Sequence, residues 1–357
     1  MMKNLNINIK DSFISECWTF YKSCILGSYS DGQKWMSTHM EVNLDGGCGS
    51  FWGNGVYYPL DYYDGILRIA PGDINKITPE KLIDYIKRKI DSNVYILIDS
   101  DYSIIYHNEE SGARLHEILI FGYDDEEEVF LCPMIDRQIA KVPFAFMKSS
   151  YEEIREIYLN DPKHRYNRRI AYFFPITEIK KRKLSMNKDE FLFSCLRKIQ
   201  DELKGEKSTI EKINPEEPSG DPRYVFKGLS MLSNLDEFLS THIKNETATD
   251  KLPIDLTLTL LNLYEHRINL SNCLKCVVET FDTNCKLKNL YDNYVLELQN
   301  IQKAYLISYK SILNNIPHKL TAIRDAVKDN MFTERHILAD FLAESEKQIE
   351  EKYLKHC

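Results

Sequence analysis

Hydrophobic positions change their spacing about halfway along the chain. Four apolar runs with strand-like composition, VYILI, YSIIY, HEILIFGY and EVFLCPMI, lie between residues 94 and 135 and are separated by short polar stretches. GYDDEEE, between the last two of these runs, indicates a hairpin turn, and a fifth run, RRIAYFFPI at 168–176, ends this half. From Asn187 onward, apolar residues recur at helical spacing over long segments. The pattern predicts an α+β first half followed by an all-helical second half.

Two helices are expected within the first half. Apolar residues recur at helical spacing from Ser15 to Leu26, and Ser15 is a good N-cap, which places Cys17 at or near a helix N-terminus. Thr-Pro-Glu at 78–80 is a strong start signal for a second helix over 79–91. Most of the glycines and many aromatic residues lie in 27–72, which favours loops and short strands there over helix.

The second half contains one segment that interrupts the helical pattern. GEKSTIEKINPEEPSGDPR combines charge with three prolines and two glycines, which is typical of a mobile loop or linker. We therefore expect two domains, at 1–180 and 181–357, with a mobile loop at about 204–223 and the remaining helices packed as a bundle.

Composition narrows the classes of partner. Charged residues make up 28% of the 357 positions and the formal net charge is -8, which favours neither nucleic acid nor an anionic membrane as a partner. The first residues lack the features of a signal peptide, and no run of 18 apolar residues marks a membrane span. Nine cysteines without a regular spacing suit free thiols in a reducing compartment. We expect a cytoplasmic protein that could use a reactive cysteine.

Two cysteines are candidate nucleophiles. GGCGSFWG at 46–53 comes within one letter of the Cys-Gly-Ser-Cys-Trp signature of papain-type cysteine proteases, but Phe51 stands where the nucleophile would be. Cys17 has the better setting, because the N–H groups and dipole of a helix N-terminus stabilise a thiolate. Cys48 is the runner-up, and a cysteine on an amphipathic helix is also a common core residue.

Of nine histidines, His116 is the best candidate for a general base. It begins a strand after the glycine-containing loop NEESGARL, where a rigid scaffold often holds catalytic side chains. His39 and His107 rank lower. The others are expected at the surface: His164, His242, His266, His318, His336 and His356. No second cysteine pair accompanies Cys273-Leu-Lys-Cys276 and no Walker-type loop exists, so neither a metal nor another cofactor is expected.

Three segments resemble a known family. SECWTF is similar to the Ser-Cys-Trp-Ala-Phe core of papain-like enzymes, with Cys17 on the nucleophile. HEILIFGYDDEEEVFLCP resembles the histidine hairpin of the butirosin-biosynthesis acyltransferase family, and KGLSMLSNLDEFL at 227–239 is similar to the start of that family's helical part. The resemblance implies a papain-like cysteine peptidase fold, an N-terminal helix with an antiparallel sheet, followed by an all-helical domain.

The same resemblance implies a function. Members of the family are cysteine-dependent acyltransferases or amide synthetases of natural-product assembly, such as nonribosomal peptide and antibiotic biosynthesis. An acyl chain would pass from a carrier-protein thioester to the cysteine, and a small amine would release it as an amide without any cofactor. Hydrolysis by a cysteine peptidase or thioesterase, or a non-catalytic binding protein with a degenerate site, are the alternatives.

Several site residues stay open at this stage. The family places an Asp or Asn about sixteen residues after the histidine, where this chain has Cys132; Asp136 lies four residues further on, so the third catalytic residue is Asp136, Cys132 or none. Polar side chains shortly before Cys17 could complete an oxyanion hole: Asp11, Ser12 and Asn8. A glycine-rich and aromatic stretch is expected to bind substrate or, equally, to be ordinary core: Cys48, Phe51, Trp52, Tyr57 and Tyr58.

Overall fold

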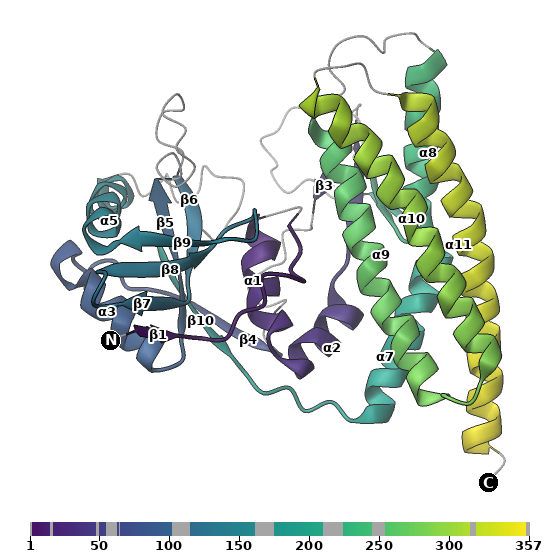
Figure 1. Ribbon diagram of the computed structural model, residues 1–357, viewed down its shortest axis with the longest axis horizontal. Helices are drawn as coiled ribbons and strands as arrows, with labels where there is room; N and C mark the ends of the chain where they lie inside the picture. The colour runs from purple at the N-terminus through teal and green to yellow at the C-terminus, as the bar shows by residue number, and fades with distance from the viewer. Residues whose placement is uncertain are drawn as a thin grey trace. The chain divides into compact units, whose positions relative to one another are not determined.

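The chain divides into two compact units in the computed structural model (Figure 1). One unit comprises residues 1–33 and 57–185, and the other comprises 34–56 and 186–357. The structure describes residues 2–14, 17–47, 50–54, 63, 65–101, 115–160, 175–209, 224–244, 254–314 and 319–354. The class is mixed helix and antiparallel sheet with a helical C-terminal region. The second unit also takes in 34–56, a segment that the sequence analysis grouped with the first half.

The first unit contains two four-stranded antiparallel sheets. One has the strand order β1 (Met2–Asn4), β7 (Gly122–Asp124), β8 (Val129–Pro133) and β9 (Ile139–Pro143). The other has the order β4 (Leu67–Pro71), β10 (Ile176–Lys181), β5 (Tyr95–Asp101) and β6 (Leu115–Ile120). Phe121 alone separates β6 from β7, so one continuous stretch of chain serves both sheets. The strand that carries His116 therefore links the two sheets.

Three of the strand predictions for this unit are confirmed: the run at 94–98 forms β5, the run at 116–123 forms β6 and β7, and the run at 128–135 forms β8. Within GYDDEEE, the first three residues form β7, and residues 125–128 make the turn to β8, which Glu128 ends with φ of 54°. The run at 102–106 lies outside the described residues. Of the strand expected at 168–176, residues 168–174 lie outside the described residues. The described strand, β10, begins at Ile176 and continues to Lys181, where it pairs with both β4 and β5.

The described part of the first unit also contains the helices α1 (Cys17–Gly27), α3 (Pro79–Asp91) and α5 (Phe144–Asn160). The prediction of a helix over 79–91 is confirmed, with Thr78 extended at the N-cap position and Pro79 in the first turn. Leu82, Ile86 and Ile90 follow at intervals of four residues and are fully buried. This spacing places them on one face and explains why the segment is helical.

The expectation of no helix within 27–72 is wrong, because α2 occupies Ser30–His39. A Cβ atom on Gly32 would lie 2.2 Å from the carbonyl oxygen of Leu26, so glycine permits the start of α2 to pack against the end of α1. Trp35 and Met36 are buried on the same helix. Gly32 thus serves a close approach and not a loop, a distinction that glycine content alone does not reveal.

Long helices dominate the second unit, as the sequence pattern predicts. They are α7 (Lys188–Lys204), α8 (Leu229–Lys244), α9 (Ile254–Thr280), α10 (Cys285–Leu313) and α11 (Leu320–Ile349), the last followed by a short π-helix, η2 (Glu350–Leu354). Asn187 and Glu190 form a reciprocal capping box that fixes the start of α7. Figure 1 shows α9, α10 and α11 running side by side, and leucine-rich clusters fill the space between the helices.

A third antiparallel sheet belongs to this helical unit. Its order is β11 (Glu206–Thr209), β12 (Tyr224–Lys227), β2 (Asn43–Gly47) and β3 (Ser50–Asn54). β11 lies within the segment expected to be a mobile loop at 204–223, so residues 206–209 correct that expectation; 210–223 lie outside the described residues. The pairing of β12 with β2 joins segments about 180 positions apart in sequence, which local patterns do not indicate.

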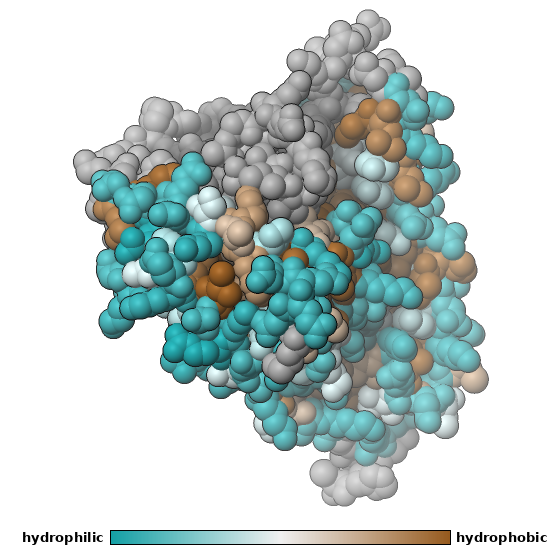
Figure 2. All heavy atoms as spheres, turned by 60° about the vertical axis from the view of Figure 1, so that its left-hand side comes forward, coloured by the Kyte–Doolittle hydropathy of each residue, from teal (hydrophilic) through white to brown (hydrophobic). Residues whose placement is uncertain are grey.

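One face of the described residues is mainly polar. Figure 2 shows a face on which hydrophilic residues predominate and hydrophobic ones form small separate patches. Among the described residues, no helix has both the length and the apolar character needed to cross a membrane.

Candidate functional site

The N-terminal end of α1 is the first component of the candidate site. The helix begins at Cys17, as the sequence predicts, and runs for 11 residues. The first N–H groups of a helix have no intrahelical partner, and the aligned peptide dipoles add partial positive charge at that end. The backbone around Cys17 therefore favours a negative charge.

A buried hydrogen bond joins α1 to β6. The hydroxyl of Tyr21 donates to the carbonyl oxygen of Glu117 at 2.8 Å. Tyr21 lies four residues after Cys17, so the two residues share a face of the helix about one turn apart. Glu117 follows His116 directly in β6. The first turn of α1 is thereby held beside the start of the strand that carries the candidate base.

His116 is held through one side of its ring. Its Nδ1 atom lies 2.9 Å from the carbonyl oxygen of Glu117 and 3.6 Å from the Oε2 atom of the same residue. Because a carbonyl oxygen only accepts, Nδ1 carries the proton in this contact and Nε2 carries the lone pair in the neutral ring. The side chain is 26% exposed, which allows a substrate to reach it.

Glu117 is a functional candidate that the sequence analysis missed. Its carboxylate is buried, and Oε1 has no hydrogen-bond partner among the described residues. Directly opposite on β5 lies Asp99, a second buried carboxylate, whose Oδ2 accepts a hydrogen bond of 2.8 Å from the hydroxyl of Tyr158. The only sequence signal was the pair His-Glu, which is uninformative because neighbouring strand residues normally point to opposite faces.

The two sequence candidates for the third catalytic residue lie in different surroundings. Asp136 occupies the exposed turn between β8 and β9, where its Oδ1 accepts from the backbone N–H of Gln138 at 3.1 Å. Cys132 is fully buried opposite Ala140, and burial raises the pKa of its thiol well above the usual range. The contacts of Asp136 stabilise the turn, and Cys132 is a neutral core thiol; a catalytic role for either residue stays a prediction.

Polar residues before Cys17 lie toward the other end of α1. Asn8 donates from Nδ2 to Asp11 at 3.1 Å and to the carbonyl oxygen of Gly27 at 3.3 Å. Gly27 ends the helix, about 15 Å from its start. Ser12 donates to the carbonyl oxygen of Ile9 at 2.7 Å. The geometry thus separates Asn8 and Asp11 from the helix end where an oxyanion would form.

The aromatic stretch expected to bind substrate falls in the second unit or outside the described residues. Phe51 and Trp52 belong to β3, which pairs with β2 in the sheet of the helical unit. Cys48, Tyr57 and Tyr58 lie outside the described residues. A role in substrate binding for any of the five stays a prediction.

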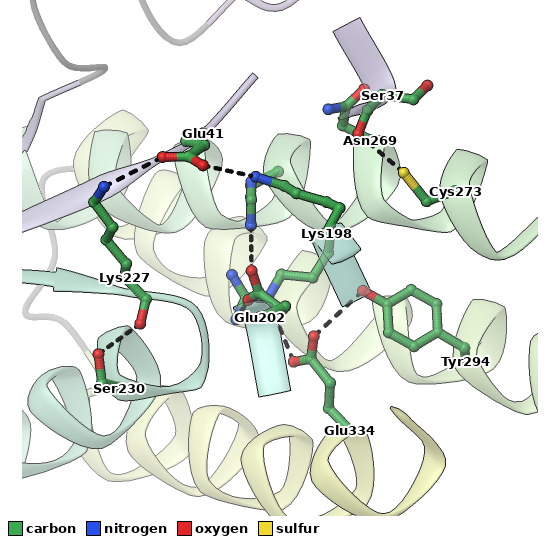
Figure 3. A network of polar contacts seen from close by, with 12 residues as sticks. Ser37, Glu41, Lys198, Glu202, Lys227, Ser230, Asn269, Cys273, Tyr294 and Glu334 are labelled. Atoms are coloured by element: carbon green, nitrogen blue, oxygen red, sulfur yellow. Dashed lines mark hydrogen bonds and ion pairs between the residues drawn. The ribbon is translucent and has the colours of Figure 1, made fainter. Parts of the chain in front are cut away.

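The helical unit contains a second histidine–carboxylate pair, whose acid, Glu202, is labelled in Figure 3. His266 in α9 lies 2.8 Å from Glu202 in α7, measured from Nε2 to Oε2, and both side chains are 3% exposed. The expectation that His266 is a surface residue is wrong, because its polar side chain has a charged partner 64 positions away in sequence. A buried polar group needs such a partner.

Arg267 extends this pair into a network across four helices. It lies 3.3 Å from Glu202 and 3.4 Å from Glu334 in α11, and Glu334 also accepts from the hydroxyl of Tyr294 in α10 at 3.3 Å. Arg267 and Glu334 are completely buried. Lys198 in α7 adds an ion pair with Glu41 at 3.6 Å. The network links α7, α9, α10 and α11 through charge.

Burial and nearby charges shift the pKa values of the two acids of this network in opposite directions. Burial opposes ionisation of Glu202, but His266 and Arg267 outweigh it and lower the pKa of this carboxyl to about 2. Burial raises the pKa of Glu334 to about 7, because Arg267 offsets only part of the penalty. Burial also lowers the pKa of His266. These groups are enclosed by helices and suit a structural role, whereas the side chain of His116 is 26% exposed.

Metal binding and family membership receive no support. Within the described ranges, no group of His, Cys, Asp and Glu side chains is arranged to hold a metal ion. No model of a known protein family matches the chain, and no curated protein matches it. The interpretation of the site therefore depends on the quoted motifs and on the geometry of α1 and β6.

Proposed function

We propose that this protein is a cysteine-dependent acyltransferase with a papain-like first unit, in which Cys17 is the nucleophile and His116 the general base. One observation carries the proposal: the Tyr21–Glu117 hydrogen bond holds α1, one turn after Cys17, against the residue that follows His116. A cysteine that begins a helix beside a histidine near the start of an antiparallel strand is the arrangement that thiolate chemistry needs.

The proposed chemistry has two halves. Nε2 of His116 takes the thiol proton of Cys17, and the thiolate attacks the carbonyl carbon of a carrier-protein thioester. The carrier thiol leaves with that proton, and an acyl-enzyme remains. An amine then attacks the acyl-enzyme, passes a proton to His116, and releases the chain as an amide while Cys17 returns to the thiol. Thioester to amide runs downhill, so no nucleotide is consumed.

The start of α1 would also stabilise the oxyanion. Both tetrahedral intermediates place negative charge on the former carbonyl oxygen, and the backbone N–H of Cys17 points from a helix end that favours such charge. Neither Asn8 nor Asp11 is needed for this role. The proposal therefore assigns the oxyanion to backbone groups.

The proposal also specifies that the acyl chain is transferred to an amine and not to water. Its support is the resemblance of the HEILIFGYDDEEEVFLCP hairpin to the butirosin-biosynthesis acyltransferase family. Natural-product assembly in the cytoplasm, with an acyl carrier protein and a small amine as partners, belongs to the same proposal. Hydrolysis by the same two residues is the competing outcome.

Intact-protein mass spectrometry after incubation with an acyl thioester tests the proposal. We expect the wild-type chain to gain one acyl group, Cys17→Ala to gain none, and addition of a diamine to release amide in excess over free acid. Cys24→Ala is the matched control, because Cys24 lies on the same helix and its burial raises the pKa of its thiol to about 12. Cys48→Ala should also acylate.

Each outcome has a definite meaning. An acylated Cys17→Ala protein would show that the nucleophile is wrong, and a wild-type protein that never acylates would exclude catalysis by this site. Free acid as the main product would make the protein a thioesterase or peptidase.

A further inference from the structure

We propose that Glu117 is the positioning residue for His116, in the place of the third catalytic residue that the sequence does not supply. The inference rests on the proposed function, since it concerns the same base. It assigns two tasks to one residue: the backbone carbonyl of Glu117 fixes the tautomer of His116, and the carboxylate stabilises the charged ring.

The carbonyl of Glu117 is the point where the helix and the histidine meet. It accepts from the hydroxyl of Tyr21 at 2.8 Å and from Nδ1 of His116 at 2.9 Å. With Nδ1 as donor, the neutral ring presents Nε2 as its base. One oxygen atom therefore couples the position of the first turn of α1 to the orientation of the ring.

The carboxylate of Glu117 supplies the charge. Its Oε2 lies 3.6 Å from Nδ1 of His116, and its side chain is 7% exposed, so the pair is only partly screened by water. When Nε2 takes the proton of the thiol, the ring becomes an imidazolium whose Nδ1–H still faces Glu117. The carboxylate accepts no proton in this step and acts through charge alone.

The described neighbours of Glu117 leave one oxygen of its carboxylate without a hydrogen bond. Asp99 lies directly opposite on β5, and its Oδ2 is occupied by the hydroxyl of Tyr158. Oε1 of Glu117 has no hydrogen-bond partner within the part of the chain that the structure describes. A buried oxygen without a partner is costly to the fold, which is a reason to look for a role that offsets it.

Glu117→Gln and Glu117→Asp separate charge from shape. We expect Glu117→Gln to slow acylation of Cys17 about tenfold with little change in KM, because a charge-assisted contact is roughly twice as strong as a neutral one. Glu117→Asp keeps the charge and should recover part of the rate. Glu127→Gln, which removes an exposed carboxylate paired with Lys141, is the matched control and should act like wild type.

Two readouts do not depend on turnover, so a failure of this inference can be told from a failure of the proposed function. Nitrogen-15 NMR of ring-labelled histidine in the wild-type chain, assigned with His116→Gln, should show neutral His116 protonated at Nδ1. Alkylation of Cys17 by iodoacetamide at pH 7 should slow in Glu117→Gln by the same factor as acylation.

Three results would overturn the inference. The first is an Nε2-protonated His116 in the wild type, which needs no variant and so holds even where a substitution prevents folding. The second is a Glu117→Gln protein that reacts as fast as Glu127→Gln. The third is a rate loss in Asp136→Asn that Glu117→Gln does not share, which would return the role to Asp136.

Discussion

The two histidine–carboxylate pairs of this protein have similar chemistry and opposite surroundings. His116 and Glu117 lie on an edge strand, 3.6 Å apart, with the imidazole 26% exposed. His266 and Glu202 lie between helices, 2.8 Å apart, each 3% exposed. The shorter and more completely buried pair is the one that no substrate can reach. Close contact between a histidine and an acid therefore does not by itself mark an active site.

The difference in burial indicates what each pair contributes to stability and to proton transfer. Charges withdrawn from water interact strongly and are costly to leave unpaired, so the His266 pair, with Arg267 and Glu334, ties the helices together. A pair whose histidine is partly exposed contributes less to stability but can exchange a proton with a substrate. The comparison predicts that substitutions in the helical network reduce stability and that substitutions around His116 reduce the rate of acylation.

Arg267→Leu should give the largest loss of stability. Removing the guanidinium leaves two buried carboxylates, Glu202 and Glu334, without their shared cation, at a cost of about 3–5 kcal/mol in the free energy of unfolding. Urea denaturation measures this change. Arg324→Leu, which removes an exposed ion pair with Asp325, is the control and should change the free energy by no more than ~0.5 kcal/mol. Equal losses in both would remove the distinction between buried and exposed pairs.

Glu334→Gln should change how stability depends on pH. The pKa of Glu334 is raised to about 7 from 4.5, so its contribution to stability is fully present below pH 4.5 and is lost as pH rises through 7. Arg267, Glu202 and Tyr294 face it and remain in the variant. Relative to Glu334→Gln, the wild type should lose about 3 kcal/mol between pH 4.5 and 7. A constant difference across that range would contradict the burial of an ionisable Glu334.

Tyr21→Phe should have a small effect on stability and a larger effect on the rate of acylation. Loss of the hydrogen bond to Glu117 costs about 1 kcal/mol, and acylation of Cys17 should slow several-fold because α1 is less firmly held beside His116. Tyr151→Phe is the matched control: it removes a buried hydroxyl bond to the carbonyl oxygen of Ile77 in the same unit. Both variants should lose similar stability, and only Tyr21→Phe should lose rate.

Local pattern predicted the elements whose causes are local. The helix over 79–91 follows from a start signal and apolar spacing, and the hairpin of GYDDEEE follows from its turn. The helix start at Cys17 was predicted for the same reason. Prediction failed for α2, because glycine content alone suggests loops: Gly32 lies within this helix, where a Cβ atom would be 2.2 Å from the carbonyl oxygen of Leu26.

The acidic partners of both histidines could not be predicted from the sequence. Helical spacing placed His266 on a helix but not its acid on α7, which only the packed fold reveals. Glu117 was next to His116 in the chain and was passed over, because strand alternation separates neighbours onto opposite faces. On an edge strand the side chain of Glu117 can turn back toward His116, and the tertiary structure is needed to show this contact.

The most direct test of the account is the rate of acyl-enzyme formation at Cys17, measured by mass spectrometry in the wild type, His116→Gln and His266→Gln under conditions where all three are folded. We predict that His116→Gln slows acylation by at least about 1,000-fold while its unfolding free energy changes by no more than ~0.5 kcal/mol. His266→Gln should acylate at the wild-type rate and unfold more easily. Acylation that survives in His116→Gln, or is lost in folded His266→Gln, would contradict the assignment of chemistry to the first pair and stability to the second.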